Sequence, residues 1–247
     1  MKRIGLIGGI SWTSTALYYE KINSWVNSKL GAHYSADIIL HSLNFEDTVQ
    51  WVHQGKWDLL AKQLKYSAKL LSQSGANYFL MCCNTAHKVY NEISEYTSIP
   101  CIHIMSPIAE IINHNKYTKV GILGTDFTMI NSFHKDYIKL HTGINLAIPD
   151  MENRSYIHKI IFSKLCHYRS KHFDLELQER INIFANHHKL DAIILACTEL
   201  IKGINPQKID VPILDSTESH AIRAAELALA VENNLTREHE VLYEFAR

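Results

Sequence analysis

The sequence predicts an α/β protein made of two similar halves, each containing a parallel β-sheet. Short apolar runs alternate with helical patterns along the chain, which is typical of parallel strands joined by right-handed crossovers. The same landmarks also occur twice, in the same order and at nearly constant separation. The matched segments are residues 3–9 with 119–125, 77–83 with 191–197, and 98–103 with 210–215. This repetition predicts two lobes related by a pseudo-twofold axis, with the active site in a cleft between them.

The first half begins with a strand at residues 3–7 that leads into Gly8 and Gly9. A helix follows Thr13 or Ser14, because apolar residues then recur at helical spacing. The other elements expected in this half are a strand at 37–43, a polar segment at 44–57, a helix at 58–74, a strand ending at Cys83, a helix at 88–95 and a strand after Pro100.

The same plan restarts at Lys119. The elements expected in this half are a strand from 119, a short strand at 146–149, helices at 154–168 and 175–187, a strand ending at Cys197 and a last helix at 219–232. That last helix is expected to return to the first lobe. We therefore assign residues 1–103 and 212–247 to the first lobe and residues 104–211 to the second.

The composition is that of a charge-balanced chain, with 25 basic and 25 acidic residues. Balanced charge gives no reason to expect a nucleic-acid or membrane partner. The amino end is too polar for a signal peptide, and no apolar run approaches the length of a membrane span. The five cysteines are an odd number, so we expect free thiols in a cytoplasmic protein rather than disulfides.

Cys83 and Cys197 occupy equivalent positions in the two halves, each at the end of an apolar strand. Asn84 and Thr85 are residue types that begin helices, and Thr198 follows the second cysteine. Backbone N–H groups and the positive end of a helix dipole would favour a thiolate or a bound carboxylate there. Ligands of open α/β sheets lie outside the carboxyl ends of the strands. We therefore expect both thiols in one cleft, on opposite sides of a ligand.

Two opposed thiols suit the inversion of a carbon centre. One group removes a proton from one face and the other returns a proton to the opposite face, with exchanged roles in the reverse direction. Lowering a cysteine pKa from about 8.5 to about 7 needs roughly 2 kcal/mol of thiolate stabilisation. The N–H groups and side chains of Asn84, Thr85 and Thr198 would hold the substrate carboxylate. No cofactor is predicted, because no electron sink is evident and Lys88 shows no Schiff-base pattern.

Other motifs carry weaker functional interpretations. Gly5, Gly8 and Gly9 lack the G-x-G-x-x-G spacing of a dinucleotide-binding loop. No metal site is expected from the histidines. His187 and His188 lie near a helix end, and Cys166 and His167 with His172 lack a matching second pair of ligands, so a solvated surface is expected for all of them. Cys82 and Cys101 lie inside apolar runs and are expected in the core.

Several segments spread over nearly the whole chain are similar to one known family. They are residues 4–15, 83–87, 124–125, 127–129, 157–161, 197–199, 211–215, Thr217 and His220. With these segments the chain resembles the cofactor-independent aspartate/glutamate racemase family. The resemblance implies two Rossmann-like domains, a homodimer and a catalytic pair at Cys83 and Cys197. It further implies substrate-binding residues, which are Gly9, Ile10 and Ser11 in the loop after the first strand, and Thr125.

One departure from the family pattern concerns the substrate. Aspartate-specific members place an arginine where this chain has residues 45–48, and Glu46 and Asp47 carry the opposite charge. The expected function is a pyridoxal-phosphate-independent amino-acid racemase that acts on aspartate or glutamate through Cys83 and Cys197. The alternatives are a broad-specificity or non-acidic amino-acid racemase, another reaction of the superfamily (maleate isomerase, hydantoin racemase or arylmalonate decarboxylase), and a non-catalytic amino-acid-binding protein.

Overall fold

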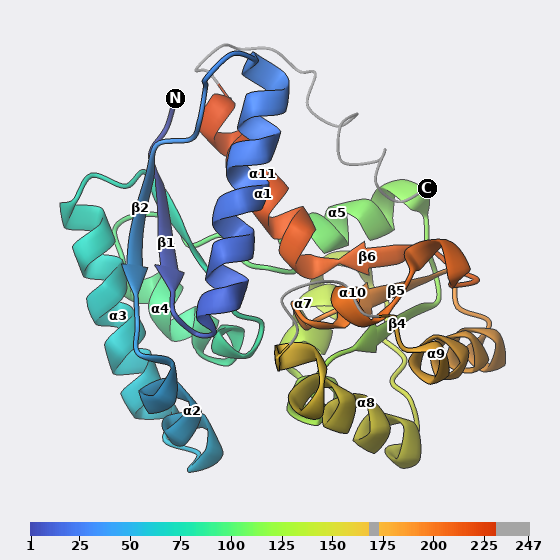
Figure 1. Cartoon of the computed structure of the whole chain (residues 1–247). Helices are drawn as coiled ribbons and strands as arrows, with labels where there is room; N and C mark the ends of the chain where they lie inside the picture. The colour runs from blue at the N-terminus through green and yellow to red at the C-terminus, as the bar shows by residue number, and fades with distance from the viewer. Residues whose placement is uncertain (168–172, 231–247) are drawn as a thin grey trace. The chain divides into compact units, whose positions relative to one another are not determined.

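Two parallel three-stranded sheets organise the chain in the computed structural model, which describes residues 1–167 and 173–230 (Figure 1). Each sheet belongs to one unit of the chain. The first unit contains Met1–Ile104 and the segment that starts at His220, and the second contains Met105–Ser219. The α/β class predicted from the alternating pattern is confirmed.

The elements of the first unit are β1 (Ile4–Gly8), α1 (Trp12–Leu30), β2 (Ile38–Ser42), α2 (Phe45–His53), α3 (Trp57–Gln73), β3 (Tyr78–Met81), the 3₁₀-helix η1 (Thr85–Val89) and α4 (Tyr90–Tyr96). The elements of the second unit are α5 (Ser106–Asn115), β4 (Val120–Leu123), α6 (Asp126–Ile130), α7 (Phe133–Thr142), α8 (Met151–Ser163), η2 (Leu165–His167), α9 (Leu175–His188), β5 (Ala192–Leu195), α10 (Leu200–Gly203), η3 (Pro206–Lys208) and β6 (Ile213–Asp215). Helix α11 (Ser216–Leu229) begins in the second unit and continues into the first.

The first sheet has the strand order β2-β1-β3, and both pairings are parallel. Successive side chains of a strand point to opposite faces of the sheet. Ile4, Leu6 and Leu80 accordingly pack with residues of α1 and α11 on one face. Ile7 and Met81 pack with α3 on the other face. Because both faces are covered, the two strands are apolar throughout rather than alternating.

The second sheet has the strand order β4-β5-β6 and is also parallel. Its main apolar cluster joins Ile193 and Leu195 of β5 to residues of α8 and α9. Residues 146–149, predicted as a strand, contribute only one bridge, between Ala147 and Gly121. Pro149 has no N–H group with which to continue the ladder, so the pairing ends there.

The second crossing between the units lies later than the predicted residue 212. Strand β6 pairs with β5, so residues 213–215 belong to the second sheet. The chain enters the first unit at His220, after which Ala221 and Ala224 pack in the core beside β1 and β3. The first crossing follows Ile104, next to the predicted residue 103. Residues 231–247, also assigned to the first lobe, lie outside the described residues.

Local capping explains where other helices differ from expectation. The polar segment 44–57 contains helix α2, because the side chain of Asn44 accepts a hydrogen bond from the N–H of Glu46 (3.3 Å). Helix α8 starts at Met151 rather than residue 154, because Asp150 accepts from the N–H of Asn153 (2.9 Å). Residue 168, the predicted end of that helix, is outside the described range. None of the helices in the described part of the chain is long and apolar enough to cross a membrane.

Candidate active site

The carboxyl ends of the first sheet gather most of the residues predicted for this unit. Strands β1, β2 and β3 run parallel, so the loops that follow them leave from one edge of the sheet (Figure 1). The N–H of Cys82 donates to the carbonyl oxygen of Ile7 (2.9 Å), and the N–H of Leu43 donates to that of Gly8 (3.0 Å). Residues 9–11, 43–44 and 82–85 therefore lie together at this edge.

The loop after β1 requires glycine at position 9. Gly9 has a φ of 81°, a left-handed conformation, and a Cβ there would overlap the backbone of Leu43. Its N–H donates to Oγ1 of Thr15 (2.8 Å), which fixes the loop to the start of α1. The side chain of Ile10 is buried in the apolar cluster against which Cys83 packs. The predicted residues Gly9 and Ile10 are thus close to the Cys83 loop.

Cys82 and Cys83 occupy opposite faces of the sheet, as strand alternation predicts. Cys82 is completely buried in the cluster formed with α1 and α11, and burial raises its pKa far above the usual range of a thiol. Cys83 is partly exposed and packs at the border of the cluster formed with α3. The two adjacent cysteines therefore differ in burial, and Cys83 is the one that solvent and a ligand can reach.

His87 fixes the backbone at Cys83. Its Nε2 accepts a hydrogen bond from the N–H of Ile104 (3.1 Å), so Nδ1 carries the proton and donates to the carbonyl oxygen of Cys83 (2.9 Å). Burial lowers the pKa of His87 to about 4, which keeps the imidazole neutral near neutral pH. His87 therefore orients the loop that carries the thiol without adding a charge.

The segment after Cys83 differs from the helix that the sequence predicts there. Asn84 has helical backbone angles and no capping bond from its side chain. Thr85 begins the 3₁₀-helix η1, and α4 starts only at Tyr90 and spans seven residues. A dipole acts through the first turn of an aligned helix, so a 3₁₀ turn followed by a short helix provides little of it. The N–H groups of the turn itself remain the candidate anion donors.

The second sheet places Cys197 at the equivalent edge of its own unit. The N–H of Ala196 donates to the carbonyl oxygen of Leu123 (2.7 Å), which joins the ends of β5 and β4. The hydroxyl of Ser216 donates to the carbonyl oxygen of Leu195 (2.7 Å), which joins the start of α11 to the same place. Residues 124–125 and 196–198 thus lie together beyond the strand ends.

The thiol of Cys197 is held directly by a carboxylate. Sγ of Cys197 donates to Oε2 of Glu199 (3.2 Å), and Oγ1 of Thr198 donates to the same oxygen (2.6 Å). All three residues are buried. The helix that follows, α10, spans only four residues, so its dipole contributes little to an anion at Cys197.

The surroundings of Cys197 oppose ionisation of its thiol. Burial raises the pKa of Cys197 well above its ordinary value, and the negative charge of Glu199 raises it further. Cys166 lies nearby on η2, and burial together with Glu199 raises its pKa to about 11, with Lys202 acting in the opposite direction. The surroundings of Cys197 therefore favour its thiol form.

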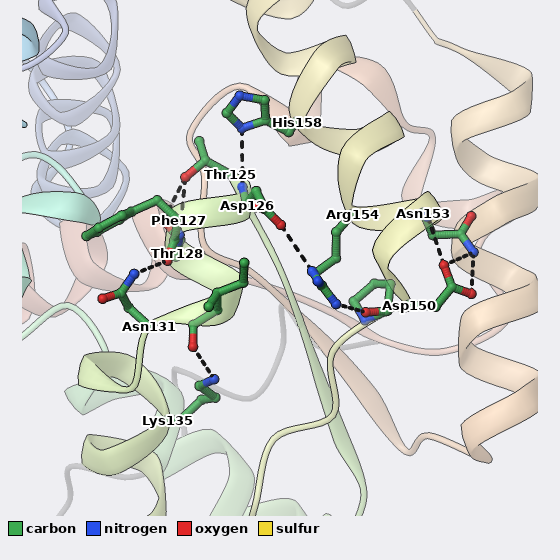
Figure 2. Close-up of polar contacts among 12 residues, drawn as sticks. Thr125, Asp126, Phe127, Thr128, Asn131, Lys135, Asp150, Asn153, Arg154 and His158 are labelled. Atoms are coloured by element: carbon green, nitrogen blue, oxygen red, sulfur yellow. Dashed lines mark hydrogen bonds and ion pairs between the residues drawn. The ribbon is translucent and has the colours of Figure 1, made fainter. Parts of the chain in front are cut away.

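Thr125 caps the first helix after β4. Its Oγ1 accepts a hydrogen bond from the N–H of Thr128 (3.3 Å), and the two hydroxyl oxygens are 3.0 Å apart (Figure 2). The N–H of Asp126 donates to Nδ1 of His158 on α8 (3.3 Å). Thr125 is therefore held rigidly at the sheet edge that also carries Cys197.

The arginine drawn in this region is already paired. Nε of Arg154 lies 3.0 Å from Oδ1 of Asp126, and Nη1 donates to the carbonyl oxygen of Pro149 (2.9 Å; Figure 2). A pocket of about 460 Å³ adjoins α6 and is lined by Asp126, Phe127, Ile130, Asn131, Ser155 and His158. Its lining includes a carboxylate and neither lysine nor arginine, so this pocket presents no permanent cation to an acidic side chain.

The start of α2 is acidic, as the sequence indicates. Nδ2 of Asn44 donates to Oδ2 of Asp47 (3.1 Å), and Nε2 of Gln50 donates to Oε1 of Glu46 (3.0 Å). These contacts keep both carboxylates on the first turn of the helix. Residues 45–48 follow β2 directly, so two acidic groups stand where aspartate-specific relatives are expected to have an arginine.

The predicted residues form two groups, one on each sheet. Gly9, Ile10, Ser11, Cys83, Asn84 and Thr85 share the edge of the first sheet, and Thr125, Cys197 and Thr198 share the edge of the second. His87 and Glu199 received no role from the sequence. Their spacing from the cysteines is the sequence feature that could identify them, because a polar side chain two or four residues after a cysteine in a turn can reach back to it. Among the described residues, no group of three or more His, Cys, Asp or Glu side chains is placed to hold a metal ion.

Comparison with known proteins adds independent information. A family model described as Asp/Glu/Hydantoin racemase matches residues 7–224. A solved structure assigned to an Asp/Glu racemase of Yersinia pestis is 34% identical, with a TM-score of 0.86, covering 93% of this chain and 100% of that chain. An aspartate racemase homologue from Pyrococcus horikoshii is 29% identical, with a TM-score of 0.81, covering 92% and 99%. The broad specificity amino-acid racemase RacX of Bacillus subtilis is 24% identical over 216 residues, covering 87% of this chain and 92% of that protein.

Proposed function

The chain belongs to the Asp/Glu/hydantoin racemase family, and we propose that it is an amino-acid racemase, an isomerase that interconverts L and D enantiomers without a cofactor. One observation carries the proposal: each sheet has a free cysteine just beyond the strand that pairs with its first strand. Cys83 follows β3, and Cys197 follows β5. Two thiols in equivalent positions supply the acid and the base that inversion requires.

In the proposed mechanism, Cys83 and Cys197 act on opposite faces of the α-carbon. A thiolate removes the α-hydrogen as a proton, and the resulting negative charge spreads onto the carboxylate. The opposing thiol donates its proton to the other face, which gives the other enantiomer and a new thiolate. One thiolate and one thiol are favoured in the complex, because two thiolates beside an anionic substrate would repel each other.

We assign the substrate carboxylate to the backbone of Asn84, Thr85 and Thr198. The support is positional, since these residues directly follow the two cysteines and begin short turns whose N–H groups suit an anion. The rest of the substrate would contact four further residues, which are Gly9, Ile10, Ser11 and Thr125. The first three share a sheet edge with Cys83, and Thr125 shares one with Cys197.

Aspartate and glutamate are the proposed substrates. The Yersinia pestis structure assigned to an Asp/Glu racemase and the aspartate racemase homologue of Pyrococcus horikoshii support this choice. A broad-specificity amino-acid racemase is the second candidate, and two observations favour it. The start of α2 carries Glu46 and Asp47, and the Bacillus subtilis relative is a broad specificity enzyme.

The test is to incubate the purified chain with each enantiomer of the common amino acids and to separate the products by chiral chromatography. The proposal expects both enantiomers of aspartate or glutamate to approach an equal mixture. Turnover of neutral amino acids with none of the acidic ones would replace the acidic assignment by the broad-specificity one. Binding without inversion of any amino acid would contradict the racemase assignment.

We also propose that the enzyme works as a cytoplasmic homodimer, as the family resemblance implies. Balanced charge and the five free cysteines are compatible with that setting. Light scattering coupled to size-exclusion chromatography at assay concentration measures the oligomeric state. A monomer that racemises at full rate would contradict the dimer and leave the chemistry unaffected.

A further inference from the structure

Glu199 has no role in the mechanism above, yet it holds the sulfur of Cys197. Its side chain is buried, with 7% of the residue exposed, and its Oε2 accepts hydrogen bonds from Sγ of Cys197 (3.2 Å) and Oγ1 of Thr198 (2.6 Å). A contact of 3.2 Å between these two acidic groups requires a proton between them, because a thiolate and a carboxylate would repel each other. A thiol is ordinarily the weaker acid, with a pKa of about 8.5 against about 4.3 for a glutamic acid, so the proton belongs on Sγ of Cys197.

We propose that Glu199 is a positioning residue that keeps Cys197 in the thiol form in the resting protein, so that Cys83 is the resting thiolate. This inference rests on the proposed two-cysteine function, and it states which cysteine is the base and which is the acid in the resting protein. Starting from the resting form, Cys83 removes the α-hydrogen and Cys197 donates its proton to the opposite face. The second hydrogen bond, from Thr198, keeps Oε2 of Glu199 directed at the sulfur.

Electrostatics favour this assignment. A thiolate at Cys197 would stand 3.2 Å from a carboxylate oxygen in a site shielded from water. Like charges at such a distance strongly disfavour double ionisation, so one group keeps its proton. Burial and Glu199 together raise the pKa of Cys197 well above its ordinary value. The backbone N–H of Glu199 lowers the pKa of Cys197 and Cys166 raises it, and the pKa remains well above its ordinary value.

The environment of Cys83 opposes a thiolate less strongly than the environment of Cys197 does. Its side chain is partly exposed, so a charge on sulfur loses less hydration than it would at Cys197. The imidazole that binds its carbonyl oxygen is neutral and contributes no like charge. A single negative charge shared between the two cysteines is therefore favoured on Cys83.

The pH dependence of alkylation tests the assignment without requiring turnover. The full chain is treated with iodoacetamide across a pH series, and the modification rate of each cysteine is followed by peptide mass spectrometry. Limited access slows a buried thiol but does not move the inflection of its rate against pH. In Glu199→Gln, which keeps an oxygen acceptor and removes the charge, the inflection of Cys197 should fall by at least about one pH unit. The inflection of Cys83 should stay in place.

Two further variants separate the charge of Glu199 from a structural role. Glu199→Asp retains the charge and should keep the inflection of Cys197 high. Glu179→Gln removes an exposed carboxylate on α9 of the same unit and should change neither cysteine. Equal inflections of Cys197 in the wild type and Glu199→Gln would overturn the proposal. A wild-type inflection of Cys197 below that of Cys83 would also overturn it, whether or not the variants fold. The predicted shift in a chain that racemises no amino acid would refute the proposed function and leave this assignment standing.

Discussion

Cys83 and Cys197 follow equivalent strands of two similar sheets, but the protein holds them in different ways. At Cys83 the contact is made to the backbone, through a hydrogen bond from neutral His87, and the sulfur stays partly exposed. At Cys197 the contact is made to the sulfur itself, by the buried carboxylate of Glu199. A repeated fold therefore supplies equivalent positions, and the side chains after each strand decide where a proton rests.

The loops after the first strand of each sheet show the same contrast. In the first unit, Gly9 adopts a left-handed conformation, and its contact with Leu43 leaves no room for a side chain. In the second unit, Thr125 uses its hydroxyl to cap α6. One loop is shaped by the absence of a side chain and the other by a hydrogen bond, so the two halves should respond differently to matched substitutions.

The largest expected effect is the loss of either thiol. Cys83→Ser and Cys197→Ser should each lower racemisation by about 10²–10⁴-fold or more, because a serine hydroxyl is too weak an acid to replace a thiol. Cys82→Ala is the matched control, since Cys82 is buried in another cluster and Ala196 occupies the equivalent place in the second half. Chiral chromatography gives the rates. Loss in Cys82→Ala with full activity in Cys83→Ser would reverse the choice between the adjacent cysteines.

The same two serine variants sharpen the comparison when hydrogen exchange is measured instead of inversion. A variant with one remaining cysteine can still exchange the α-hydrogen of the enantiomer that this cysteine faces, through the thiolate form of that cysteine. Cys83→Ser and Cys197→Ser should therefore select opposite enantiomers, as followed by proton NMR in deuterium oxide. Because Glu199 keeps Cys197 protonated, exchange should be slower in Cys83→Ser than in Cys197→Ser. Selection of the same enantiomer by both variants would contradict opposed faces.

Acid should lower the free energy of unfolding by roughly 3 kcal/mol, because His87, which orients the Cys83 loop, is kept neutral in the folded protein. The pKa of His87 is about 4 in the folded protein and 6.5 ordinarily, so between these values the unfolded chain binds the extra proton. The contribution is complete above about pH 6.5 and is lost as the pH falls toward 4. Thermal unfolding at several pH values measures it. His87→Gln should flatten the pH dependence and the exposed His53→Gln should not; equal slopes in both would contradict the assignment.

Filling the glycine loop should have a smaller effect, confined to stability and to the shape of the first site. Gly9→Ala should destabilise the protein by about 2 kcal/mol, because it adds overpacking against Leu43 to an unfavourable φ. Gly55→Ala is the matched control, with a φ of 68° and open space around the position, and should cost only about 1 kcal/mol. Urea unfolding compares the two. Equal losses would show that the contact with Leu43 is unimportant.

The strand ends could be predicted from the sequence because buried parallel strands are apolar on both faces. Residues 78–83 and 191–197 carry that pattern, and strand alternation correctly separates Cys82 from Cys83. The late crossing at His220 could not be predicted. It depends on β6 pairing with β5 before the chain leaves the second unit, and local sequence does not encode that pairing.

The chemistry around the two cysteines was harder to predict than their positions. An N-cap residue type at Asn84 suggested an α-helix, whereas the backbone forms a 3₁₀ turn with no capping bond from that side chain. The contact from Glu199 back to Cys197 depends on the dihedral angles of a three-residue turn. Burial raises the pKa of Cys197 well above its ordinary value, the charge of Glu199 raises it further, and the dipole of a four-residue helix contributes little against them.

Racemisation in deuterium oxide, started from one pure enantiomer, is the most direct test of two opposed thiols. Mass spectrometry after chiral separation measures α-deuterium in both enantiomers early in the reaction. Two opposed thiols should put deuterium into the product from the first time points and leave the recovered substrate largely protiated. The donating thiol has exchanged with solvent, whereas the thiolate returns the proton that it removed. Equal deuterium in recovered substrate and product from the start would contradict two opposed thiols, because it would indicate one base serving both faces.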